Sequence, residues 1–277
     1  MSFKFICSAT AVAAVLALSA GVASAASFPD FVVDPTLSGA TSGGSTFTAD
    51  KITGNYVEYI EFTGLNTFKF ALRWVAGQFV GSDGTDPFDG FDTGLGVTYG
   101  LYAQTTGSGT FNTSGSGVTT FLVNSGGTVQ FTYDLYSDTK TKYTNVGAAI
   151  INEATLFAKT GDALDDAMLA TGQADNGIGT LDPATCALGG INCGSFGQQS
   201  SISLNADGKK FFTAPVPFYT LSFSAGQLNN FDVGRTQVIN GSLDIVFDNK
   251  VPEPSALALV GLALVGLGLA SRRSTKA

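Results

Sequence analysis

The segment Phe68-Lys69-Phe70-Ala71-Leu72-Arg73-Trp74 indicates the fold class of this chain. Large apolar side chains occupy every second position, and the charged Lys69 and Arg73 fall between them. A period of two places alternate side chains on opposite faces of a β-strand, so one face of this strand is predicted to be buried. The same alternation recurs at 129–135, 219–223 and 243–247.

Residues 26–250 are expected to form one all-β domain, because no linker divides them and their length is sufficient for a substantial core. Gly- and Ser-rich turns separate the alternating segments. One short helix is predicted at 162–170, where acidic residues precede Gly172. Further strands are predicted at 56–63, 97–103, 118–123 and 148–158. The expected fold is an antiparallel two-sheet sandwich with a jelly-roll-like arrangement.

The composition excludes several classes of function. Among 277 residues there is no His, which rules out Ser-His-Asp catalysis and His-ligated zinc. The 14 basic and 22 acidic residues give a net charge of −8. Nucleic-acid binding depends on clustered Lys and Arg, so we expect no nucleic-acid partner.

Residues 1–25 have the features of a secretory signal peptide. Lys4 supplies a positive charge, residues 11–18 form an apolar core, and Ala23-Ser24-Ala25 is a small-residue cleavage site. The apolar core is too short to span a bilayer comfortably. We therefore expect export through the Sec route and maturation after Ala25.

Residues 251–277 form a second distinct segment. Pro252-Glu253-Pro254 precedes an apolar stretch at 255–270, and Arg272 and Arg273 follow it. A helix over this stretch would be about 24 Å long, short of the roughly 30 Å of a bilayer core. We predict a single, marginal transmembrane helix whose basic end lies in the cytoplasm.

These three parts together resemble the PEP-CTERM sorting signal of exported bacterial proteins. The resemblance implies recognition and cleavage by an exosortase, a membrane transpeptidase, in bacteria that make exopolysaccharide. The chain would be anchored transiently in the inner membrane and then reach the cell surface or extracellular matrix. An ordinary tail anchor is the alternative.

A second resemblance runs in patches across residues 26–250. The patches are similar to the flocculation-associated subgroup of the same sorted proteins, whose role is to hold cells and exopolysaccharide together. None of them is a catalytic motif. They are Phe28-Pro29-Asp30-Phe31-Val32-Val33, the run from Ala49 to Glu58, Gly77-Gln78-Phe79-Val80 and the run from Phe211 to Tyr219.

Without its ends the chain is more acidic and has two cysteines. Residues 26–250 contain 10 basic and 21 acidic side chains, a net charge of −11. Cys186 and Cys193 are expected to form a disulfide, because the chain is exported. The alternative, a redox-active pair, does not match the C-x-x-C spacing.

An acidic loop and an aromatic residue are the candidate ligand sites. Asp83, Asp86, Asp89 and Asp92 recur every three residues in a Gly-rich segment, and such carboxylates suit Ca²⁺. A solvated acidic loop is the favoured interpretation, because the spacing fits neither the EF-hand loop nor the nonapeptide calcium repeat. Trp74 is a candidate sugar contact, although its place on the apolar face of its strand favours core packing.

The overall expectation is a structural or adhesive protein of the envelope and matrix, with no cofactor other than calcium. A lectin-like carbohydrate-binding module is the alternative. An enzyme is not expected. Glu58 and Glu61, for example, are three residues apart in a strand and point to opposite faces, so they cannot act together as glycosidase carboxylates.

Overall fold

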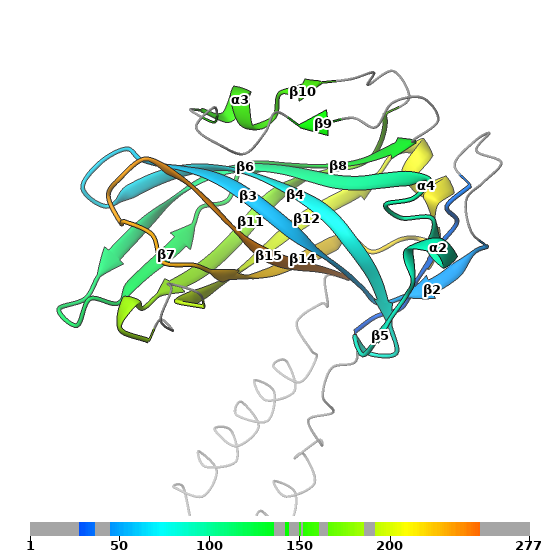
Figure 1. Cartoon of the computed structure of the whole chain (residues 1–277), viewed down its shortest axis with the longest axis horizontal. Helices are drawn as coiled ribbons and strands as arrows, with labels where there is room; N and C mark the ends of the chain where they lie inside the picture. Colours follow the sequence, from blue (N-terminus) through cyan, green and yellow to red (C-terminus); the bar gives the residue numbers. More distant parts are fainter. Residues whose placement is uncertain are drawn as a thin grey trace, which may run out of the picture.

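Eight antiparallel strand positions close into a barrel (Figure 1). A computed structural model describes residues 28–36, 45–135, 142–143, 150, 152–160, 166–185 and 192–249. The strands follow one another around the barrel in chain order, and β7 and β8 lie in line in one position between β6 and β11. They are β3 (Lys51–Phe62), β4 (Thr67–Gly81), β6 (Tyr99–Thr113), β7 (Thr119–Val123), β8 (Gly127–Leu135), β11 (Ala167–Leu181), β12 (Gly194–Leu204), β14 (Leu221–Leu228) and β15 (Gln237–Asp248).

The first and last barrel strands pair with each other, and this pairing closes the ring. β15 runs antiparallel to β3, from Gln237 opposite Ile60 to Ile245 opposite Ile52. The predicted two-sheet sandwich, with its jelly-roll-like arrangement, is therefore wrong. Alternation identifies a strand with one buried face, and a sandwich and a barrel share that property, so the pattern could not distinguish them.

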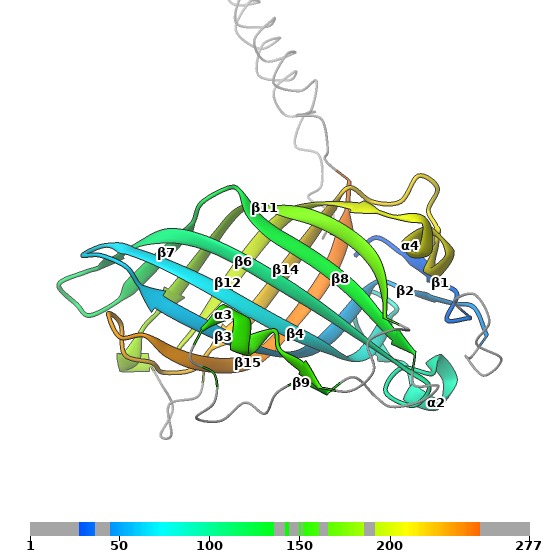
Figure 2. The ribbon, with the colours of Figure 1, turned by 90° about the horizontal axis from the view of Figure 1, so that it is seen from above.

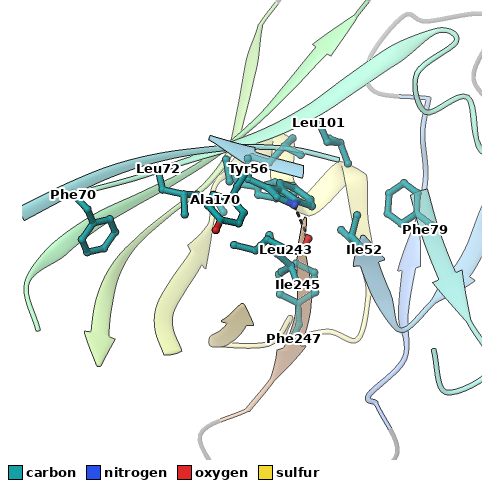
Figure 3. Packing of buried hydrophobic residues seen from close by; sticks show 14 of the residues in the cluster. Ile52, Tyr56, Phe70, Leu72, Phe79, Leu101, Ala170, Leu243, Ile245 and Phe247 are labelled. Carbon is teal, nitrogen blue, oxygen red and sulfur yellow. Dashed lines mark hydrogen bonds between the residues drawn. The ribbon is translucent and has the colours of Figure 1, made fainter. Parts of the chain in front are cut away.

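The face of β4 that was predicted to be buried does point into the barrel. In the β3–β4 pair, Tyr56 lies opposite Trp74 and Ile60 opposite Phe70, and all four side chains are buried. Figure 3 shows Tyr56, Leu243 and Ile245 converging on the interior from β3 and β15. The alternation in β4 therefore predicts the correct inward face even though the predicted architecture was different. In β14 (Leu221–Leu228) the same prediction is wrong, because Ser222 and Ser224 line the interior and Leu221 and Phe223 do not.

One end of the barrel, where β3 begins and β15 ends, is closed by a cap. The cap is a three-stranded sheet of β1 (Phe31–Val33), β2 (Phe47–Ala49) and β13 (Phe212–Ala214), joined by helix α4 (Ala206–Phe211). The ring of Phe31 lies 5.2 Å from that of Phe247 and 5.8 Å from that of Phe212. Helix α2 (Gly90–Thr93) and strand β5 (Asp86–Pro87) lie at the same end, and the short helix η1 (Pro183–Thr185) follows β11.

The connection between β8 and β11 covers part of the outer wall (Figure 2). It includes β9 (Lys142–Tyr143), α3 (Glu153–Leu156) and β10 (Lys159–Thr160). Leu156 is fully buried against Tyr59 and Ala71, and its carbonyl accepts a 2.9 Å hydrogen bond from Arg73 Nη1. Arg73 therefore lies on the outer face of β4 as predicted, but beneath α3 and away from solvent.

Two local predictions in this region are wrong. The strand expected at 148–158 is interrupted by α3, because Asn152 and Thr155 form a capping box that starts a helix. The helix expected at 162–170 does not form over its last part, where β11 begins at Ala167. Residues 161–165 lie outside the described residues.

The predicted signal peptide at 1–25 and transmembrane helix at 255–270 also lie outside the described residues. Among the helices that are described, none has the length and hydrophobicity needed to cross a membrane.

Trp74 packs against a glycine on the neighbouring strand. Its Nε1 donates a 2.9 Å hydrogen bond to the carbonyl of Leu243, and the indole lies over Gly54 of β3. A Cβ at position 54 would overlap both the indole nitrogen and the carbonyl oxygen of Val75. The interior therefore requires glycine at this position.

Gly54→Ala is predicted to destabilise the protein by about 1–3 kcal/mol, the usual cost of overpacking a core. Urea unfolding of the purified protein measures this. Gly115→Ala is the control, because a Cβ there meets nothing within 4 Å. Equal unfolding free energies for the two variants would contradict the packing described.

Candidate functional site

The barrel encloses a cavity of about 100 Å³ whose walls are mostly apolar. Residues from every barrel strand and from β13 of the cap line it, and Phe231 from the β14–β15 connection contributes to its wall. The cavity is rich in aromatic rings. These belong to Phe68, Phe70, Trp74, Phe121, Phe131, Phe196, Phe212, Phe231 and Phe247.

A group of neutral polar side chains lines one part of this cavity. Ser200 and Gln198 of β12 lie opposite Ser222 and Ser224 of β14, and all four are among the lining residues. Gln198 Nε2 donates a 3.1 Å hydrogen bond to Ser200 Oγ. We call these four residues the polar wall. It supplies hydroxyl and amide groups to an otherwise apolar space.

Glu58 is the charged residue in the cavity wall. It lies on the inward face of β3 between Tyr56 and Ile60, and it is only 9% exposed. Among the described residues it has no hydrogen-bond or ion-pair partner. Burial raises the pKa of its carboxyl from an ordinary 4.5 to about 8, because the low-dielectric surroundings disfavour the charged form.

In the sequence, Glu58 stands out only as one half of a possible pair of glycosidase carboxylates, with Glu61. The opposite orientation expected for the two residues is correct, since Glu61 faces outward and forms a 3.0 Å ion pair with Lys69. The signal for a buried carboxyl was nevertheless present. Ile52, Tyr56, Glu58 and Ile60 share one parity, so the acid falls on the apolar face of the strand.

Glu58 is predicted to make stability depend on pH. Between pH 4.5 and about 8 the folded protein keeps the Glu58 proton and the unfolded chain does not, so stability falls as the pH rises. Glu58→Gln removes this dependence. The variant should gain up to about 4 kcal/mol over wild type between pH 5 and pH 8, at about 1.4 kcal/mol per pH unit.

Urea unfolding at several pH values measures this difference. Glu61→Gln, on the outward face of the same strand, is the matched control. An identical change with pH in both variants would show that Glu58 is not the group responsible.

Trp74 does not occupy an exposed sugar-binding surface. It is fully buried inside the barrel, its ring 5.8 Å from that of Phe131. The core interpretation of Trp74, which the alternation favoured, is what the structure shows. A polysaccharide chain outside the barrel cannot stack on this ring.

The four aspartates proposed for calcium have separate local roles. Asp83 has a left-handed backbone (φ 58°) in the turn after β4, Asp86 lies in β5, and Asp89 caps α2 by accepting from the Phe91 amide at 2.9 Å. Asp92 lies in the first turn of α2. Across the described residues no group of three or more acidic or cysteine side chains is placed to hold a metal ion. Calcium binding by these aspartates stays a prediction.

Cys193 is buried directly before β12. Its backbone amide donates to the carbonyl of Leu228, and its carbonyl accepts from the amide of Asp182. Cys186 lies outside the described residues, so the pairing of Cys186 with Cys193 stays a prediction.

The outer wall carries a polar groove of about 380 Å³ between α3 and strands β3, β4 and β6. Tyr59, Glu61 and Lys69 form one side, and Tyr59 Oη donates a 3.4 Å hydrogen bond to Glu61. Burial and the nearby Glu61 raise the pKa of Tyr59. Asn152 and Glu153 of the α3 segment form part of the opposite side. We call this the outer groove.

Residues 250–273 match the PEP-CTERM protein-sorting motif. This segment contains Pro252, Glu253, Pro254, Arg272 and Arg273, all of which lie outside the described residues. The motif indicates an exported protein that is sorted and processed by an exosortase after membrane anchoring. Comparison with curated proteins finds no match, and comparison with solved structures finds none either.

Proposed function

We propose that this exported protein is a non-enzymatic structural or adhesive component of the cell envelope and extracellular matrix. In this role it would associate with exopolysaccharide and contribute to floc or biofilm formation. The observation that carries the proposal is the sorting motif, which begins at residue 250, two residues after β15 ends at Asp248.

The position of the motif would determine how the barrel is presented. β15 ends at the capped end of the barrel, and the motif begins two residues later in the sequence. The capped end would therefore be the end nearer the sorted segment. The loops at the other end, which join β3 to β4 and β14 to β15, would face the matrix.

The outer wall supports contact with neutral sugars better than attraction to anionic ones. Residues 26–250 carry a net charge of −11, which repels an anionic polysaccharide. Neutral hydroxyl pairs occur on the outward faces of the strands. The hydroxyl oxygens of Thr106 and Thr128, for example, lie 2.8 Å apart. Such groups exchange hydrogen bonds with sugar hydroxyls at little desolvation cost compared with charged groups.

A carbohydrate-binding module is the second candidate, and the outer groove is what favours it. Its volume is within the range of about 300–1,000 Å³ that small-molecule sites occupy. Tyr59, Lys69 and Asn152 offer a ring edge, a cation and an amide on its walls. This site replaces Trp74 as the proposed sugar contact.

The structural role predicts a loss of flocs in two deletion strains of the producing bacterium. Deleting this protein, or deleting the exosortase, should reduce floc formation. A copy with Pro252→Ala and Pro254→Ala should fail to restore it, whereas the wild-type copy should succeed. Normal floc formation in both deletion strains would defeat the adhesive role.

The carbohydrate-binding role predicts that Lys69→Ala weakens binding of the native exopolysaccharide about tenfold. Loss of one hydrogen bond to a charged group costs about 1.5 kcal/mol, which corresponds to that factor. Surface plasmon resonance with immobilised polysaccharide measures it. Lys209→Ala on α4 is the control, an exposed lysine at the capped end. Equal binding by both variants would exclude the outer groove.

A further inference from the structure

We infer that the interior of the barrel binds a small organic amine, a basic nitrogen on a short hydrocarbon frame, and that Glu58 holds the nitrogen. This site lies inside the barrel, apart from the outer surface to which the proposed adhesive role is assigned. It rests on the cavity, on its aromatic walls and on a buried carboxyl that has no partner among the described residues.

Glu58 is isolated from other charged groups in the barrel interior. Buried carboxyl groups in proteins are normally hydrogen-bonded or ion-paired, because an uncompensated one is costly. Glu58 is the only acidic or basic residue among the described residues that line the cavity. Glu61, Lys69 and Arg73 lie on the outward faces of β3 and β4. No cation of the described barrel therefore faces Glu58.

The nearest phenol on the same strand does not fill this role. Tyr56 Oη donates a 2.9 Å hydrogen bond to the carbonyl of Gln227. Burial, with a smaller contribution from Glu58, raises the Tyr56 pKa far above its ordinary value, so this side chain is neutral. The carboxyl of Glu58 thus lacks a positive counterpart that a bound ligand would provide.

The size of the cavity limits the ligand to a small molecule. A cavity of about 100 Å³ is three to four times the roughly 30 Å³ that a water molecule occupies in the liquid. It is smaller than the about 150 Å³ of an apolar cavity that takes up benzene. A ligand of about five non-hydrogen atoms fits this range.

The aromatic walls of the cavity suit a cation with a hydrocarbon frame. Aromatic faces attract cations, and Phe70, Trp74 and Phe131 are among the rings that line the cavity. An alkylammonium ion brings its own proton, so Glu58 releases its proton to water and an N⁺–H···O⁻ pair forms. The polar wall adds neutral oxygens to the lining of the same cavity. The hydrocarbon part of the ligand contacts the phenylalanine rings.

Isobutylamine and isobutanol are the probes, because they have the same shape and differ in the basic nitrogen. The full-length protein is titrated with each at pH 8.5 and followed by ¹H–¹⁵N chemical shifts of the barrel strands. We expect isobutylamine to bind with a Kd on the order of 1 mM, as its few atoms allow. Glu58→Gln should raise the Kd of isobutylamine at least tenfold and change the Kd of isobutanol less than threefold.

Two controls separate interior binding from surface binding. Asp232→Asn removes an exposed carboxyl next to Phe231 and should leave the affinity for isobutylamine unchanged. The affinity of the wild-type protein should rise more than tenfold from pH 6 to pH 8.5, because Glu58 must ionise to pair with the cation. The amine stays protonated throughout this range.

Three outcomes would overturn the inference. The first is that the chemical-shift changes are confined to exposed residues. The second is that wild type and Glu58→Gln bind isobutylamine with equal affinity. The third is that the affinity of the wild-type protein for isobutylamine falls as the pH rises. The ¹³C signal of the Glu58 carboxyl gives a readout that does not depend on a variant. Saturating isobutylamine must lower the Glu58 pKa, and an unchanged pKa would also refute amine binding.

Discussion

The pairing of β15 with β3 is the constraint on which the rest of the structure depends. It joins residues 237–245 to residues 52–60, at opposite ends of the domain in sequence. Without it the sheet would have two long unpaired edges, and such edges invite pairing with other chains. With it, the inward faces of all the strands enclose one space, and the outward faces are left for solvent and for the α3 segment.

That enclosed space explains why the interior combines rings, hydroxyls and one acid. A flat sheet packed against another can fill its core with aliphatic side chains, whereas a closed ring of eight strands leaves room at its axis. The Phe and Trp side chains occupy most of this room. The remainder is the cavity beside Glu58, which water or a small ligand can share with the polar wall.

How far sequence reasoning succeeds depends on the range of the interactions involved. Strand alternation correctly placed Phe68, Phe70 and Trp74 on one buried face, and the sorting motif was evident because both signals are local. Barrel closure was missed because it depends on which distant strands pair. Arg73 lies on the predicted outward face, but its burial depends on the packing of α3, a contact that strand alternation does not predict. The burial of Glu58 follows from the face of the strand that it occupies, and a search for pairs of carboxylates does not test that property.

Closure by the last strand also sets the order of events during biogenesis. Ribosomes make β3 early and β15 last, and the sorting segment follows β15 almost at once. The ring therefore cannot close before β15 is available, and pairing between strands so far apart in the sequence is an intrinsically slow folding step. The sorting motif begins two residues after β15 ends, so the strand that completes the barrel is also the strand that leads into the motif.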